Sequence, residues 1–210
     1  MMISRFFFLF SLIITSSYAA MQDFCVADYA APQSPAGYAC KDPTKVTVDD
    51  FVFSGLRVAG NISSINKVRF SSAFAVNFPG LNGLGVSLVR SDFSVGGVVS
   101  IHSHRDATEL VILIEGTVLA GFIASNNKPY VKSLNKGDTM VFPQGLFHFL
   151  VNVGNTPALA YASFSSANPG VQFLETALFQ NNLPTEIIAK STLLDTVQIQ
   201  KLKRLLGGTN

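Results

Sequence analysis

The residues of this chain best suited to chemistry are its three histidines and one nearby glutamate. His102 and His104 are separated by one residue, Glu109 follows, and His148 comes later in the chain. Because alternate residues of a β-strand point to the same face, one strand would present the first two imidazoles side by side. Imidazole nitrogens and carboxylate oxygens bind divalent metal ions. The spacing predicts a metal site with three histidines and one carboxylate; the alternative is exposed or core histidines without a shared role.

These four residues need short strands to position them, and the sequence supplies such strands. Runs rich in β-branched and apolar residues recur from residue 68 onward, with turns of glycine, asparagine and proline between them. Strands at this regular spacing indicate a sandwich or a small barrel. We therefore predict an all-β single domain, with strands near residues 84–90, 98–104, 110–114, 117–123, 130–134, 139–142, 148–153 and 159–164.

The end of the chain has a different pattern. Leucines and one valine between residues 194 and 206 approximate a period of 3.6 residues, and Gly207 and Gly208 follow as a stop signal. This pattern is typical of an amphipathic helix. We expect a small helical extension whose apolar stripe packs either on its own barrel or on a neighbouring subunit.

The beginning of the chain has the organisation of a secretory signal peptide. Arg5 precedes an apolar run over residues 6–14, and small residues follow at Ser17 and Ala19. We predict a signal peptide over residues 1–19, with cleavage after Ala19 or Ala20, and a mature domain over residues 20–210. The apolar run is shorter than the about 20 residues that span a bilayer. An uncleaved anchor is the alternative, and no later stretch predicts a membrane span.

Two cysteines and one sequon fit an extracellular protein. An even number of cysteines in a secreted chain suggests one disulfide, here between Cys25 and Cys40, with two free thiols as the alternative. Asn61 begins an Asn-Ile-Ser sequon in a polar stretch, which makes it a candidate glycosylation site.

The charge of the chain excludes one class of function. The formal net charge is only +2, and basic residues cluster only over residues 201–204, near the end. Nucleic-acid binding would require a basic patch or stripe. We therefore expect no nucleic-acid partner.

Two segments around the predicted ligands resemble the paired motifs of cupins. Residues 97–116 contain His-Ser-His and the later glutamate between two glycines, and residues 137–152 contain Pro-Gln-Gly followed by His148. With the segment Gln-Asp-Phe-Cys-Val-Ala-Asp at residues 22–28, the chain resembles the plant germin-like proteins.

The resemblance implies a single-domain cupin β-barrel, or jelly roll, with C-terminal helices from about residue 175. It implies that His102, His104, Glu109 and His148 bind manganese. It also implies secretion to the apoplast or cell wall, a role in plant defence or stress, and assembly into a homohexamer built as a trimer of dimers. From the residues alone, manganese and iron both suit mixed nitrogen and oxygen ligands with room for water, whereas a closed four-coordinate site would suit zinc.

The chain departs from the pattern of the family that it resembles at two places. The family often has prolines immediately before the first ligand histidine and after the second, where this chain has Ser100-Ile101 and Arg105. Oxalate-oxidising germins have asparagines at the positions of Val89 and Val99, where they are thought to hold the substrate. Valine cannot donate a hydrogen bond to a carboxylate, so we expect no efficient oxalate oxidation.

Two functions from different classes remain. The first is superoxide dismutation of the manganese type, with a metal-bound water as proton source and with Asn152 and Arg105 as candidate helpers near the metal. Asn152 could equally be an ordinary strand-end residue. The second is a non-enzymatic role as a cell-wall structural protein, a receptor, or a binder of a small auxin-like signal.

Overall fold

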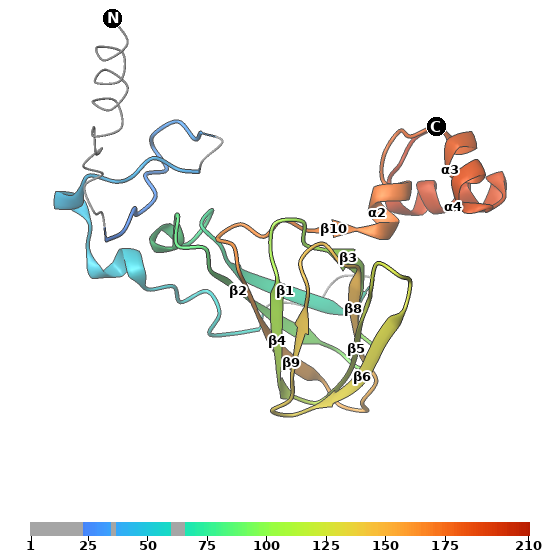
Figure 1. Cartoon of the computed structure of the whole chain (residues 1–210), viewed down its shortest axis with the longest axis horizontal. Helices are drawn as coiled ribbons and strands as arrows, with labels where there is room; N and C mark the ends of the chain where they lie inside the picture. Colours follow the sequence, from blue (N-terminus) through green and yellow to red (C-terminus); the bar gives the residue numbers. More distant parts are fainter. Residues whose placement is uncertain (1–22, 35–36, 60–65) are drawn as a thin grey trace, which may run out of the picture.

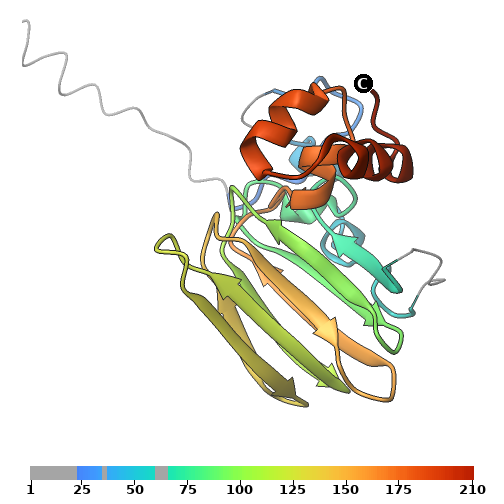
Figure 2. The same cartoon turned by 90° about the vertical axis from the view of Figure 1, so that its right-hand side faces the viewer.

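Two five-stranded antiparallel sheets form the body of the molecule and face each other as a sandwich (Figures 1 and 2). The computed structural model describes residues 23–34, 37–59 and 66–210. The predicted signal peptide and the Asn61 sequon lie outside the described residues. One sheet has the strand order β1-β2-β9-β4-β7 and the other has the order β10-β3-β8-β5-β6.

The strands are short and follow the predicted spacing. Their bounds are β1 Val68–Ala73, β2 Ser87–Phe93, β3 Val98–Ser103, β4 Glu109–Glu115, β5 Thr117–Ile123, β6 Pro129–Asn135, β7 Thr139–Phe142, β8 His148–Asn152, β9 Ala158–Phe164 and β10 Gln172–Phe173. With the short helical elements at the end of the chain, this is the predicted all-β jelly roll with a C-terminal extension, so the prediction of the fold class is confirmed.

Alternation along the strands places the core between the sheets. On β9, Ala158, Ala160, Ala162 and Phe164 are buried, while the residues between them are partly exposed. On β4 the inner residues are buried and the intervening outer ones are exposed. A two-residue period of this kind is expected for strands with one face in a core. Burial of each large apolar side chain contributes about 1.5–3 kcal/mol.

The N-terminal segment is tied to the sandwich by a disulfide and by backbone hydrogen bonds. Cys25 and Cys40 are bonded, with their Cα atoms 4.8 Å apart, as the sequence predicted. The amide of Ala27 donates to the carbonyl of Pro79 at 3.0 Å, which joins this segment to the loop before β2. The short 3₁₀ helices of this part are η1 Pro43–Lys45, η2 Val48–Phe51 and η3 Pro79–Leu81. In a loop-entropy account, a disulfide closing a loop of this length contributes about 3 kcal/mol.

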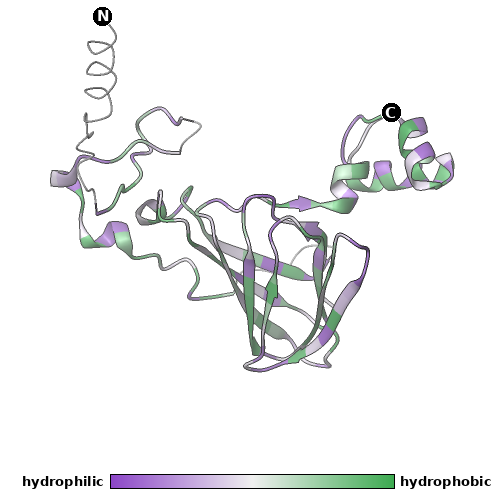
Figure 3. Ribbon diagram, viewed as in Figure 1, coloured by the Kyte–Doolittle hydropathy of each residue, from purple (hydrophilic) through white to green (hydrophobic). Residues whose placement is uncertain are grey.

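The C-terminal extension consists of three short helices, α2 Leu174–Phe179, α3 Thr185–Thr192 and α4 Thr196–Leu206. They share a small core of their own, built on Phe179, Ile188 and Ile199. Helices α3 and α4 each carry hydrophobic and hydrophilic residues (Figure 3). Asp195 accepts a hydrogen bond at the start of α4, and Gly207 ends the helix with a φ of 86°, as expected for N-caps and C-terminal glycines. Among the described residues, no helix is long and apolar enough to cross a membrane.

Candidate metal centre

The four predicted ligands come together between the two sheets. Glu109 begins β4 of one sheet, His148 begins β8 of the other, His102 lies near the end of β3, and His104 follows that strand directly. All four side chains are buried, and one ligand atom from each lies within 4.8 Å of the others. Residues separated by up to 46 positions thus form one cluster, as the sequence predicted.

A bulge in β3 aims its side chains at this cluster. Val99 pairs with Leu150, but the next pair is His102 with His148, so β3 carries one extra residue between the two pairs. A bulge of this kind shifts the alternation of side chains along a strand. Val99 and His102 are therefore both buried, although three positions separate them. The extra residue falls where the family often has prolines, so the bulge forms here with Ser100-Ile101 in that place.

Backbone carbonyls orient the three imidazoles. The Nδ1 atom of His102 lies 2.8 Å from the carbonyl oxygen of Ser100, and that of His148 lies 2.9 Å from the carbonyl oxygen of Leu146. The Nδ1 atom of His104 meets the carbonyl oxygen of Gly170. A carbonyl only accepts, so each Nδ1 carries the hydrogen and donates it. This arrangement is common around metal-binding histidines because it leaves Nε2 as the ligand atom.

The contacts of Glu109 indicate that a cation belongs at this centre. Its Oε2 atom lies 3.0 Å from Nε2 of His148 and 3.2 Å from Nε2 of His104. With its hydrogen on Nδ1, an imidazole that carries no second proton would turn a lone pair toward the carboxylate, so these contacts need positive charge at the centre. A divalent ion supplies that charge, so the donor set fits a metal. The other source would be protonation of the imidazoles themselves.

The ionisation of two of the ligands also fits a metal. Burial lowers the pKa of His102 to about 4, with the neighbouring His148 adding to the effect, so this imidazole is neutral at neutral pH. Burial opposes ionisation of Glu109, but the contacts with His104 and His148 outweigh it and lower the pKa of this carboxyl to about 2. A carboxylate beside a neutral imidazole is the form in which both groups bind metal ions.

The second motif also holds the loop that carries His104. The side-chain amide of Gln144 donates to the carbonyl of Arg105 at 2.8 Å, and the amide of Gly145 donates to the carbonyl of His104 at 2.9 Å. Phe142 stacks on the ring of His148 with centroids 4.5 Å apart. These contacts fix two ligands from behind, and such support affects metal affinity in many proteins.

Two residues expected near the metal have other places in the structure. The side chain of Arg105 is 90% exposed and pairs with Asp106 at 2.8 Å. Asn152 is buried at the far end of β8, where its amide group donates to the carbonyls of Ser94 and Thr156 and accepts from Gly154. The structure does not bring either residue to the four ligands. The contacts of Asn152 favour the interpretation that it is an ordinary residue at the end of a strand.

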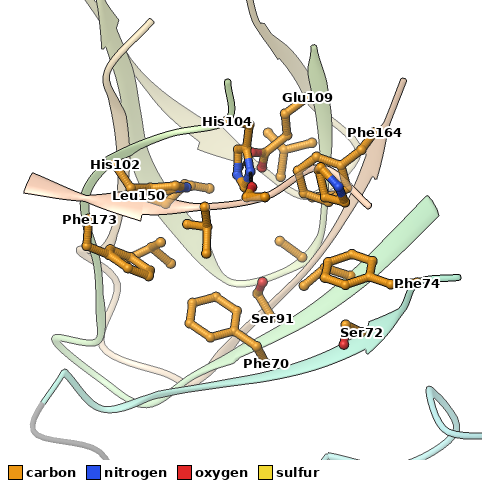
Figure 4. Close-up of a pocket in the computed structure, with 18 of the residues that line it drawn as sticks. Phe70, Ser72, Phe74, Ser91, His102, His104, Glu109, Leu150, Phe164 and Phe173 are labelled. Atoms are coloured by element: carbon orange, nitrogen blue, oxygen red, sulfur yellow. Dashed lines mark hydrogen bonds and ion pairs between the residues drawn. The ribbon is translucent and has the colours of Figure 1, made fainter. Parts of the chain in front are cut away.

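A pocket of about 410 Å³ adjoins the ligands (Figure 4). Val89 and Val99 line it beside His102, His104 and Glu109, so neither position offers a hydrogen-bond donor there. Most of the other walls are apolar, and they include four phenylalanines, Phe70, Phe74, Phe164 and Phe173. Small-molecule sites commonly have volumes of about 300–1,000 Å³ and mostly apolar walls.

Sequence reasoning missed the segment that closes one side of the pocket. Residues 168–171 and Phe173 line it, and Gly170 also orients His104. The only signal for this segment was its Pro-Gly pair, which marks a turn but not what the turn touches.

The comparisons with known proteins agree with this geometry. A family described as Cupin matches residues 54–200. An auxin-binding protein of Prunus persica is 59% identical over 209 residues, covering 100% of both chains. A germin-like protein of Morus alba is 54% identical, covering 99% of this chain and 100% of the relative.

Solved structures are similar as well. An oxalate oxidase in complex with glycolate has a TM-score of 0.85 and 36% sequence identity, covering 89% of this chain and 96% of that one. The extent of the family match and of the whole-chain identities shows that this chain belongs to the germin-like proteins of the cupin superfamily.

Proposed function

We propose that this protein is a secreted manganese-binding protein of the apoplast or cell wall with superoxide dismutase activity. The observation that carries the proposal is the buried cluster of His102, His104, Glu109 and His148, with its Nε2 atoms and one carboxylate oxygen converging. Three neutral imidazoles and one carboxylate leave a divalent ion with about one net positive charge. That charge favours binding of a small anion.

The reaction needs little from the protein beyond this cluster. One superoxide gives up an electron and becomes oxygen, and a second takes up that electron with two protons and becomes hydrogen peroxide. A bound redox-active ion would supply the electron relay between the two. The chain's own residues hold the ligands in place, and the apolar walls beside Val89 and Val99 offer no polar partner to an organic dianion. Efficient oxalate oxidation is therefore not part of the proposal.

The test combines metal analysis with an activity assay on the same secreted sample. We expect about one manganese per chain, and superoxide dismutation that chelation removes and manganese restores. The variants His102→Ala and His148→Ala should lose both metal and activity. Stoichiometric manganese without turnover would refute the enzymatic proposal, and a sample that binds no metal under manganese saturation would refute the centre itself.

A second candidate function is binding of a small molecule without turnover. The pocket of about 410 Å³ is much larger than superoxide requires, and its apolar walls suit an organic body. Similar proteins of Prunus persica bear the name auxin-binding protein. Titration calorimetry with indole-3-acetic acid on the manganese-loaded protein tests this function. Absence of heat at millimolar ligand would count against it, whatever the dismutation assay shows.

We also propose that secretion begins with removal of residues 1–19 and that Asn61 carries a glycan. The disulfide between Cys25 and Cys40 supports passage through an oxidising compartment. N-terminal sequencing of the secreted protein should begin at Ala20 or Met21, and treatment with a glycosidase should lower its mass. A mature protein that starts at Met1 would contradict the first point.

Assembly into a hexamer built as a trimer of dimers is the remaining part of the proposal. Outer faces of the sheets and helices expose large apolar side chains that a neighbour would cover, among them Leu110, Ile112, Val141, Leu193 and Val197. Light scattering on the purified protein should give six times the mass of one mature chain. A monomer at micromolar concentration would contradict this proposal.

A further inference from the structure

The side of the pocket away from the metal centre carries two serine hydroxyls. Ser91 lies on the inner face of β2 and is only 8% exposed, and Ser72 lies on the neighbouring strand β1. Both line the pocket. Figure 4 shows them on the opposite side of it from His104 and Glu109.

These hydroxyls differ from another inner-face serine of the same sheet. Ser87 on β2 donates to the carbonyl of Ser166 at 2.6 Å. Neither Ser91 nor Ser72 has a side-chain hydrogen bond within the part of the chain that the structure describes. Among the described residues, no fully buried polar side-chain atom lacks a hydrogen-bond partner, so the unbonded hydroxyl of Ser91 is open to the pocket that this residue lines. The serine at position 91 is therefore placed for a partner that comes from outside the chain.

The space between the two polar sides suits a flat apolar body. Phe70, Phe74 and Phe173 are drawn around it in Figure 4. Ala160 and Ala162 on β9 also line the pocket, and their small side chains leave room between the sheets. Phe164 already packs edge to face on the ring of His104, with centroids 4.7 Å apart. Aromatic walls favour aromatic ligands in stacked or edge-to-face contact.

We propose that the pocket binds an aromatic acid that carries a hydroxyl group at the end opposite the acid. Its carboxylate would meet the metal centre, its ring would lie among the phenylalanines, and its hydroxyl would pair with Ser91 and Ser72. These two serines then select between ligands that share the same acid and ring. This inference rests on the second candidate function, the binding of a small molecule.

The test compares two probes that differ by one group. Phenylacetate and 4-hydroxyphenylacetate share the acid and the ring, and only the second has the distal hydroxyl. Titration calorimetry on the full mature protein loaded with manganese should show about a 5-fold preference for 4-hydroxyphenylacetate, within the range expected for one hydrogen bond. Ser91→Ala, which removes only the hydroxyl, should abolish most of this preference while it leaves the affinity for phenylacetate and the metal content unchanged.

Two further variants complete the experiment. Ser72→Ala should also reduce the preference, and it provides a second measurement if Ser91→Ala folds poorly. Ser133→Ala, on the exposed strand β6 and outside the pocket, should have no effect. Equal affinity of the wild type for both probes, or a preference that survives Ser91→Ala and Ser72→Ala together, would overturn the inference but not small-molecule binding. If neither probe binds, both this inference and the proposed binding of a small molecule would be overturned.

Discussion

The two sides of the pocket hold their polar groups in different ways. On the metal side, the Nδ1 atom of each imidazole has a backbone carbonyl partner, and the opposite ring nitrogens converge with one carboxylate. On the far side, Ser91 and Ser72 lie among apolar walls. The first side is preorganised for a cation, and the second is shaped to accept the body of a ligand. The chain thereby separates retention of a metal from choice of a ligand, and variants should be able to remove one property and keep the other.

The largest loss of metal affinity should follow from removing the negative charge on the metal side of the pocket. Glu109→Gln keeps the size of the side chain but removes the one negative charge among the four ligands. We expect a loss of metal affinity greater than 100-fold, beyond the about 10- to 100-fold typical of residues behind the ligands, together with loss of dismutation. Competition with a chelator of known affinity measures it.

A matched control exists on the same strand. Glu115 ends β4 and is exposed, so Glu115→Gln removes the same charge far from the cluster and should leave metal binding unchanged. Retention of stoichiometric manganese in Glu109→Gln at limiting metal would show that three histidines suffice and that the carboxylate has another role.

The second largest effect should be a loss of ligand affinity caused by a substitution on the side of the pocket away from the metal. Ala160 pairs across the sheet with Ser91, so Ala160→Leu adds volume at the end remote from the ligands. We expect affinity for aromatic acids to fall at least about 10-fold, while metal content and dismutation change little, because superoxide needs far less space. Overpacking costs about 1–3 kcal/mol where no space exists, so thermal unfolding of the variant must be followed as well. An equal loss of metal and ligand binding would show that the two sides are not separable.

A smaller loss of metal affinity is expected when a residue that supports the loop after His104 is changed. Gln144→Ala removes the hydrogen bond that holds the loop after His104. We expect about a 10-fold loss of metal affinity, at the lower end for groups that support ligands. The exposed Gln198 on α4 offers a control of the same residue type remote from the pocket, since Gln198→Ala should have no effect. Unchanged affinity in Gln144→Ala would assign the support of this loop to the Gly145 amide alone.

Sequence reasoning predicted the cluster of candidate ligands because histidine is rare in this chain and the spacing of these residues follows strand geometry. All three histidines of the chain lie in the cluster. The bulge in β3 could not be predicted, since it depends on pairing with β8, and a pattern of two-residue alternation does not reveal an extra residue. The role of Gly170 was hidden for a related reason. Its contact with His104 joins residues 66 positions apart through a backbone carbonyl. Every residue has such a carbonyl, so the residue type gives no signal of the contact.

Arg105 shows the opposite case, in which a residue type suggested more than its position supports. Because its guanidinium follows a candidate ligand histidine in sequence, Arg105 was predicted to lie near the metal as a candidate helper. In the structure the side chain points into solvent, and its charge is balanced by Asp106. Exposed charges at such sites act weakly and are screened by salt. We therefore expect Arg105→Ala to change the rate of superoxide dismutation by less than about 2-fold at physiological ionic strength. A larger fall in this rate that vanishes at high salt would show that the exposed guanidinium steers superoxide toward the metal. The metal side of the pocket would then both retain the metal and attract the substrate.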